Sequence, residues 1–244
     1  MRLSILTMAA AAALAVPAAA VAAVADPATE DQGWRGEGEL GLALASGNTD
    51  SQTLNGRLGL VREDVLWEHE VGLALLYGKQ DDIESAWRYE AFGKTGRRVG
   101  DRGRWFGSMR TERDHFAAYE YQSTVATGYS HQLVDREATQ LRVEIGPGYR
   151  WSKLQGVRVH ENGAIARGQM ELGHRFNAST LVYDTLLIEA GQDNTFARNE
   201  AGVAVSMTDA LALKAALEVR HNTDVLPGIR KTDTLTTVNV VYGF

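Results

Sequence analysis

The sequence predicts an all-β protein, a transmembrane antiparallel up-and-down β-barrel of about 12 strands. Side chains alternate between apolar and polar through most of the chain, a period of two that is typical of strands. The alternating segments are about 10–13 residues long, which fits a tilted membrane strand better than the usual ~5–6 residues of a soluble strand. Aromatic residues also gather near the segment ends. These three observations favour a barrel whose apolar face meets lipid.

The N-terminus has the pattern of a secretory signal. Arg2 precedes a long apolar run, and small residues lead up to Ala25. We expect residues 1–25 to be a signal peptide for Sec-type export, cleaved near Ala25. A short periplasmic lead-in over 26–33 and one barrel domain over 34–244 would follow, in the outer membrane of a Gram-negative bacterium.

Twelve segments carry the alternation and are predicted as strands. They cover 34–46, 51–62, 65–78, 85–96, 105–113, 119–130, 139–151, 163–174, 180–190, 196–207, 211–221 and 232–244. In the seventh segment, for example, Leu141, Val143 and Ile145 share one face, and Arg142 and Glu144 share the other.

The ninth and tenth segments are the weakest of the twelve. Leu186 to Ile188 are apolar on both faces, so the register of these two strands stays open. The Ala-rich stretch over 201–217 would also suit a helix. Val203 and Val205 nevertheless alternate with small residues, and a Thr208–Asp209 turn interrupts the stretch, which favours strands.

The connections bear on which face lies inside. In a soluble periplasmic barrel, the alternative architecture, the apolar face would fill the core. Connections that alternate between short and long instead suit an outer-membrane barrel with periplasmic turns and outer loops. The predicted short turns are 62–64, 175–179 and 208–210, and the predicted longer loops are 79–84, 152–162 and 222–231. Two connections break the rule, since 97–104 is long for a turn and 46–50 is short for a loop.

Aromatic residues are predicted to form two belts at the level of the lipid headgroups. The belt residues are Trp34, Trp67, Tyr77, Trp87, Trp105, Tyr121, Tyr129, Tyr149, Trp151 and Tyr242. Tyr183 and Phe244 are assigned to the same rim as Trp105.

The opposite face is charged and is predicted to line the lumen. Its charged residues are Arg35, Glu37, Glu39, Arg57, Glu68, Glu70, Arg88, Glu90, Lys94, Arg110, Glu112, Arg142, Glu144, Arg150, Arg167, Glu171, Lys214, Glu218 and Arg220, joined in a wider count by Glu120, Glu200 and Asp233. Positive and negative groups are nearly balanced, and twelve strands enclose a narrow bore. We therefore expect a salt-bridged plug or a narrow, weakly selective pore, with Arg142 beside Glu144 and Arg88 beside Glu90.

Composition excludes several function classes. The chain has no cysteine, hence no disulfide scaffold or thiol nucleophile, and its formal charge of −6 argues against a nucleic-acid partner. The six histidines lack metal-site spacing, so no metal or cofactor is expected.

Catalysis and calcium binding are the remaining alternatives. His115 near Thr111, Asp114 and Ser123 is the nearest approach to the Ser–His–acid set of a lipid hydrolase, and we expect no catalytic residue. Asp81, Asp82 and Glu84 could supply oxygen ligands to calcium, although a solvated acidic loop is the simpler interpretation.

Four sequence stretches point to a family. They are GELGL at 38–42, SGNTD at 46–50, GPGYR at 146–150 and VVYGF at 240–244. The chain resembles the YdiY-like, salt-stress-induced outer-membrane protein family, a domain of unknown function. The resemblance implies an outer-membrane barrel linked to osmotic or salt stress and transfers no catalytic residue.

The resemblance also bears on partners and role. The terminal Phe244 resembles the signal that such barrels present to the barrel-assembly machinery, and lipids and lipopolysaccharide are the other expected partners. The expected role is a narrow or plugged channel or an envelope-stabilising element. Sequence leaves the oligomeric state open.

Overall fold

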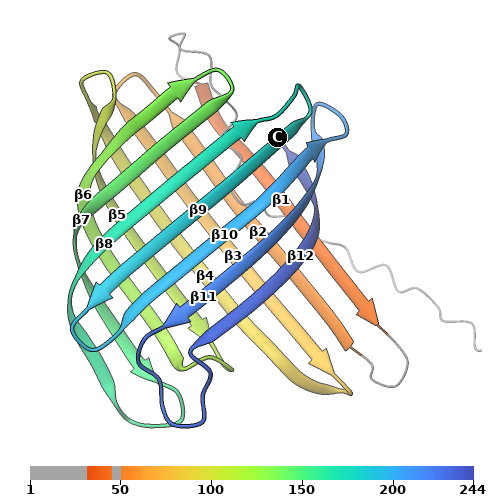
Figure 1. Cartoon of the computed structure of the whole chain (residues 1–244), viewed down its shortest axis with the longest axis vertical. Coiled ribbons are helices and arrows are strands. Elements are labelled where there is room, and N and C mark those ends of the chain that lie inside the picture. The colour runs from red at the N-terminus through yellow and green to blue at the C-terminus, as the bar shows by residue number, and fades with distance from the viewer. Residues whose placement is uncertain (1–31, 46–50) are drawn as a thin grey trace, which may run out of the picture.

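The structure, a computed structural model, describes residues 32–45 and 51–244. The predicted signal peptide therefore lies outside the described residues. The described chain forms twelve strands of one closed antiparallel sheet (Figure 1). They are β1 (Gln32–Ala45), β2 (Ser51–Glu63), β3 (Trp67–Gln80), β4 (Ile83–Val99), β5 (Gly103–Asp114), β6 (Tyr119–Arg136), β7 (Thr139–Leu154), β8 (His160–Arg175), β9 (Thr180–Gly191), β10 (Thr195–Ser206), β11 (Leu211–Asn222) and β12 (Thr232–Gly243). In the described residues no helix is long and apolar enough to span a bilayer.

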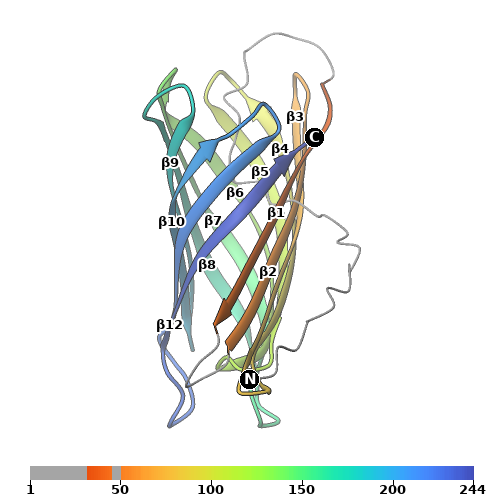
Figure 2. The same ribbon diagram turned by 90° about the vertical axis from the view of Figure 1, so that its right-hand side faces the viewer.

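The barrel closes between its first and last strands. β1 pairs with β12 in antiparallel register, with Glu37 opposite Gly243 and Leu40 opposite Val240, and the two strands lie side by side in Figure 2. Two further backbone hydrogen bonds, Gly36 N to Phe244 O (2.7 Å) and Phe244 N to Gly36 O (2.8 Å), extend this seam. Every other strand pairs with its neighbours in sequence. The predicted fold class is confirmed.

Two predicted connections are corrected because the strands are longer than the alternation alone indicated. β4 reaches Val99 and β5 begins at Gly103, so the connection predicted as long over 97–104 is a three-residue turn. The loop predicted over 79–84 is also wrong. β3 and β4 are joined by Asp81 and Asp82 alone, both at positive φ (51° and 62°), the backbone of a tight primed hairpin turn.

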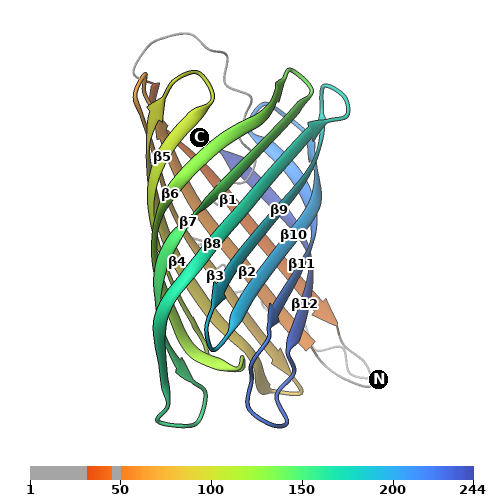
Figure 3. The ribbon, with the colours of Figure 1, turned by 60° about the vertical axis from the view of Figure 1, so that its left-hand side comes forward.

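The two ends of the barrel differ, as Figures 1 and 3 show. We call the end that carries the chain terminus Phe244 and the β2–β3, β4–β5, β6–β7, β8–β9 and β10–β11 turns the turn end. The other is the loop end, and its longest described connections are 155–159 and 223–231. At the turn end, the Asp64 carboxylate accepts hydrogen bonds from the backbone N–H groups of Leu66 (2.8 Å) and Trp67 (2.7 Å), which lower the pKa of Asp64.

Alternate residues on each strand separate into an apolar exterior and a polar interior. Leu42, Ile145 and Val238 are exposed outside, whereas Glu39 and Lys214 are buried inside. The predicted belt aromatics occupy outward positions, with contacts such as Trp105–Tyr129 and Tyr149–Trp151. This distribution inverts that of a soluble barrel and suits a lipid surround.

Tyr183 departs from this pattern. The prediction that Tyr183 joins a rim is wrong, because its side chain is 4% exposed and turns into the barrel. Its hydroxyl donates to Glu200 Oε1 (2.9 Å), and Lys214 Nζ lies 4.9 Å from the centre of its ring.

Candidate functional site in the barrel interior

The charges predicted to face the lumen lie inside the barrel, where they line its central cavity or are buried in its wall. They come from alternate positions of strands all around the ring. Some of their ion pairs join neighbouring strands, and others join walls that face each other across the bore. Arg198 on β10 and Glu90 on β4, for example, are paired although their strands are six positions apart in a ring of twelve. Three networks of such pairs follow one another along the interior.

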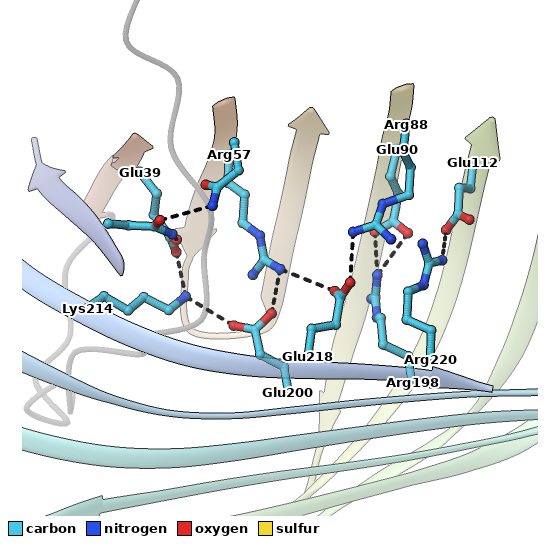
Figure 4. A network of polar contacts seen from close by, with 12 residues as sticks. Glu39, Arg57, Arg88, Glu90, Glu112, Arg198, Glu200, Lys214, Glu218 and Arg220 are labelled. Atoms are coloured by element: carbon cyan, nitrogen blue, oxygen red, sulfur yellow. Dashed lines mark hydrogen bonds and ion pairs between the residues drawn. The ribbon is translucent and has the colours of Figure 1, made fainter. Parts of the chain in front are cut away.

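The first network runs from β1 to β4 through β10 and β11, and Figure 4 shows it. Lys214 Nζ lies 2.6 Å from Glu39 Oε1 and 3.2 Å from Glu200 Oε1. Arg57 Nη2 lies 2.5 Å from Glu200 Oε2 and 3.4 Å from Glu218 Oε2. Glu218 Oε1 then accepts from Arg88 Nη2 (2.8 Å), so a chain of charges of alternating sign crosses the bore.

Amides extend this network toward the seam. Asn239 Nδ2 donates to Glu39 Oε2 (2.8 Å), and Asn55 Nδ2 donates to Asn239 Oδ1 (3.1 Å). The Glu39 carboxylate, whose side chain is fully buried, thus receives hydrogen bonds on both oxygens. Hydrogen bonds to both oxygens offset the desolvation cost of burying the carboxylate.

The second network centres on Arg110 of β5. Its guanidinium lies 2.9 Å from Glu189 Oε2 on β9, 3.1 Å from Glu112 and 3.3 Å from Glu90. Arg198 Nη1 on β10 reaches both oxygens of Glu90, at 2.8 and 2.9 Å. A further guanidinium, that of Arg220 on β11, pairs with Glu112. Arg110 and Arg220 also lie over the ring of buried Phe196, 4.9 and 5.3 Å from its centre.

The third network lies nearer the turn end. Lys94 Nζ on β4 is 3.2 Å from Glu144 on β7, 3.3 Å from Glu70 and 3.6 Å from Glu171. Arg167 donates to the other oxygen of Glu144 at 3.1 Å. Arg142 and Arg104 converge on Glu68 in the same region, the former at 3.2 Å.

Arg88 and Arg142, which the sequence places beside Glu90 and Glu144 on their own strands, pair with carboxylates of other strands. Arg88 pairs with Glu218, and Arg142 pairs with Glu68 at 3.2 Å and Glu171 at 3.9 Å. Neither forms a described ion pair with its neighbour two residues along, Glu90 or Glu144 respectively. Glu171 lies directly opposite Arg142 on the adjacent strand β8, so this pair crosses the ladder between neighbours. Glu218 and Glu68 lie on more distant strands of the ring.

Sequence reasoning missed three charged residues of the networks, Arg104, Glu189 and Arg198. Arg198 lies two residues before Glu200 on the same face, so the alternation could have found it. Glu189 was hidden by the apolar run over 186–188. Glu120 lies outside the three networks and pairs with Arg113 (3.3 Å) and Lys153, while Asp233 is exposed.

At the loop end, part of the β11–β12 loop packs inward. Ala118, Tyr119 and Leu154 form a buried apolar cluster against which Val225 and Leu226 of the β11–β12 loop pack. The Tyr119 hydroxyl donates to Glu161 Oε2 (2.8 Å) and to Asp224 O (3.4 Å).

Asn194 holds the same loop by its side chain. Its Nδ2 donates to Asn222 Oδ1 (2.8 Å), and its Oδ1 accepts from Thr223 Oγ1 (3.3 Å) and Asp224 N (3.1 Å). The β11–β12 loop is thereby drawn inward over the mouth.

The cavity lies on the other side of these contacts. Its volume is about 950 Å³, and its lining includes Asp101 and Arg102 of the β4–β5 turn, Ala138 of the β6–β7 turn and the terminal Phe244. No residue of the described loop-end connections lines it. We call this cavity the vestibule; it reaches the turn end and is lined in part by residues of the ion-pair networks.

The residues that come nearest to a hydrolase set in the sequence make other contacts in the structure. Ser123 Oγ is hydrogen-bonded to Thr111 Oγ1 (2.8 Å), and His115 Nδ1 lies 3.4 Å from Trp87 O. Asp114 Oδ1 accepts from the backbone N–H groups of Phe116 (2.9 Å) and Ala117 (3.1 Å). These contacts do not assemble a nucleophile with a base.

A metal site does not assemble either. The described residues contain no group of three or more His, Asp or Glu side chains placed to hold a metal ion. Asp81 and Asp82, the candidate calcium ligands, form the tight β3–β4 turn.

Fold and interior together define the class of protein: a twelve-stranded transmembrane β-barrel whose interior is lined with paired charges. The chain belongs to the family described as "Protein of unknown function, DUF481", which matches residues 38–244. It is 24% identical over 229 residues to the uncharacterized protein YdiY of Escherichia coli K12, covering 89% of this chain and 86% of that protein. The family resemblance found in the sequence is confirmed.

Solved structures similar to this chain include membrane barrels. The translocator domain of the autotransporter NalP from Neisseria meningitidis aligns with a TM-score of 0.49 and 14% identity, covering 88% of this chain and 89% of that one. The NanC porin aligns with a TM-score of 0.44 and 9% identity, covering 86% and 98%.

Proposed function

We propose that this protein is a narrow outer-membrane channel that is closed at rest by ion pairs across its bore. The observation that carries the proposal is the first network, in which Lys214, Glu200, Arg57, Glu218 and Arg88 link opposite walls without a break. Except for the last, Arg88, each of these charges is paired with opposite charges on both sides. Passage of a solute would break the pairs and leave buried charges without partners, which is energetically costly, so the pairs act as a plug. No dedicated anion pathway is expected, since the interior has no basic excess.

The vestibule gives the proposed channel a direction. With the short turns on the periplasmic side, as in bacterial outer-membrane barrels, the cavity opens to the periplasm and the inward β11–β12 loop covers the outer mouth. Two barriers would then act in series, the loop and the ion pairs. Solute would enter the vestibule from the periplasmic side, and it would cross the barrel only when both barriers open.

Single-channel recording in planar bilayers tests the proposal. The wild-type protein should give small or rare conductance steps. One variant removes a complete pair across the bore (R88A together with E218A), so that Arg57 keeps Glu200 as its partner. A second replaces residues 224–230 by a short Gly–Ser turn. We expect larger steps when the two changes are combined.

A rim pair provides the control. R113A together with E120A removes an ion pair that is not part of the three networks, and it should leave conductance unchanged. Large, continuously open, anion-selective steps from the wild-type protein would contradict the plug. A combined variant that still gives no steps would contradict a channel and favour a static envelope-stabilising barrel.

Location, partners and physiological setting belong to the same proposal. The apolar exterior supports insertion into the outer membrane, in contact with lipids and lipopolysaccharide, and the closing strand with Phe244 supports recognition by the assembly machinery. Equal migration of boiled and unboiled samples, or recovery in the soluble periplasmic fraction, would contradict the location.

For the stress link, a deletion strain should lose fitness at high salt and regain it with the wild-type gene. Equal growth of the deletion and wild-type strains at high salt would refute the link.

A further inference from the structure

β8, β9, β10 and β11 form the longest run of neighbouring strands without an outward aromatic residue, and β2 is the other described strand that has none. Among the described residues, outward aromatics occur on β1, β3, β4, β5, β6, β7 and β12, but none occurs on these four strands. β9 and β10 each have an aromatic residue near one end, Tyr183 and Phe196, and both turn inward and are buried. At the rim of this four-stranded wall, Phe176 of the β8–β9 turn is 74% exposed, so aromatic anchoring of the wall is confined to that turn.

The same wall carries a polar pair. Asp184 of β9 and Asn199 of β10 occupy outward positions, and Asn199 Nδ2 lies 3.1 Å from each carboxylate oxygen of Asp184 and 3.2 Å from Thr185 O. Among the described residues, Asn199 is the side chain that hydrogen-bonds to this carboxylate. The outward neighbours on β9 are apolar, with Val182 and Ile188 both exposed.

The pair lies at the depth of the hydrocarbon. Asp184 is four residues from the turn-end start of β9, and Asn199 is four residues from the loop-end start of β10. At about 3.4 Å per residue and a tilt of about 40°, each lies roughly 10 Å from its strand end, inside an apolar band about 25 Å tall. A carboxylate at this depth, with one amide for a partner, is poorly suited to a lipid surround.

We infer that this wall, centred on Asp184 and Asn199, is the interface through which two copies of this chain associate in the membrane. The pair is self-complementary: it offers a carboxylate acceptor beside an amide donor. A two-fold axis would bring the amide of each copy to the carboxylate of the other, the arrangement that an isologous interface requires. A second barrel would remove the carboxylate from lipid and cover the four strands that carry no outward aromatic residue.

Cysteine cross-linking in native membranes tests the interface, because the chain has no cysteine of its own. Ala201 is outward on β10 and directly opposite Asp184 in the β9–β10 register, so A201C places one thiol at the centre of the wall. L73C on β3, exposed on the outer surface away from this wall, is the matched control. After treatment with a short bismaleimide, A201C should give a product of twice the chain mass, at least tenfold more than L73C gives.

A second variant separates the interface from chance contact. D184L together with N199L replaces the polar pair by side chains that lipid tolerates, so the barrel should still fold, as shown by heat-modifiable migration. In the A201C background these changes should lower the dimeric product at least tenfold. Equal cross-linking of A201C and L73C would overturn the inference. So would a cross-linked product of another mass, or an A201C product that is unchanged by D184L together with N199L.

Discussion

Removing the positive charge of Lys214 should destabilise the barrel more than any change at the rim. Lys214 and its partner Glu39 have side chains that are 1% and 0% exposed, with 2.6 Å between Nζ and Oε1. K214M keeps most of the side-chain length and removes the charge. Glu200 would retain Arg57 at 2.5 Å and the Tyr183 hydroxyl at 2.9 Å. The main effect of K214M is therefore that the Glu39 carboxylate loses its positive partner.

The magnitude follows from the partners that Glu39 keeps. In K214M, the described hydrogen bond left to its carboxylate is that from Asn239 Nδ2 at 2.8 Å. Breaking a buried pair by removing one partner costs about 3–5 kcal/mol, whereas replacing both charges is often close to neutral. We therefore expect a loss of about 3–5 kcal/mol for K214M, and recovery to within roughly 1–2 kcal/mol of wild type when E39Q is added.

Urea unfolding of the barrel in vesicles measures these values, with the folded fraction read from the migration of unboiled samples. K153M is the control, because Lys153 pairs with Glu120 at the rim, where their side chains are 26% and 25% exposed. Such a pair contributes about 0–1 kcal/mol. If K214M unfolds within about 1 kcal/mol of wild type, or if adding E39Q destabilises it further, the view that the interior charges neutralise one another is refuted.

Three further predictions concern the wall of the barrel. V143R places a charge on the lipid face of β7 at a cost of roughly 2–4 kcal/mol, so it should block assembly. Q140R, on the cavity side of the same strand, should be tolerated. Equal membrane yields of the two variants would contradict the assignment of faces. Deleting Phe244 removes two hydrogen bonds of the β1–β12 seam and the ring stacked on Tyr242, so outer-membrane yield should fall, and an unchanged yield at native expression would exclude that role. G146A forces a methyl group against the backbone of Thr127 on β6, so it should lower the urea midpoint, whereas G107A, with open space around its Cβ position, should not.

Much of the architecture could be predicted from the sequence because strand side chains alternate strictly. Once one face of a strand such as β7 is known to be apolar, its polar face is fixed, and short connections make consecutive strands neighbours. The alternation does not distinguish the two faces where both are apolar. The run over 186–188 therefore concealed Glu189, and the rim assignment of Tyr183 followed the expectation that aromatic residues face lipid.

Pairing across the bore could not be predicted in the same way. Which carboxylate Arg88 or Arg142 reaches depends on strand tilt and on the radius of the closed ring, and neither quantity is local to a strand. The inward fold of Val225 and Leu226 likewise depends on the distant Tyr119 and Leu154. The Asp81–Asp82 turn was missed because two aspartates are not the usual residues at positive φ.

Side-specific labelling of single cysteines tests the closed, periplasm-facing lumen most directly. Three variants suit it: D193C in an exposed connection at the loop end, Q122C on the inner wall beneath the β11–β12 loop, and Q132C in the lining of the vestibule. The reagent is a polyethylene glycol maleimide too large to pass general porins, applied to intact cells and to cells whose periplasm has been opened. The account predicts that D193C reacts from outside, that Q132C reacts only once the periplasm is open, and that Q122C is protected from outside. Labelling of Q122C in intact cells at the rate of D193C would show that the outer mouth is open and would contradict it.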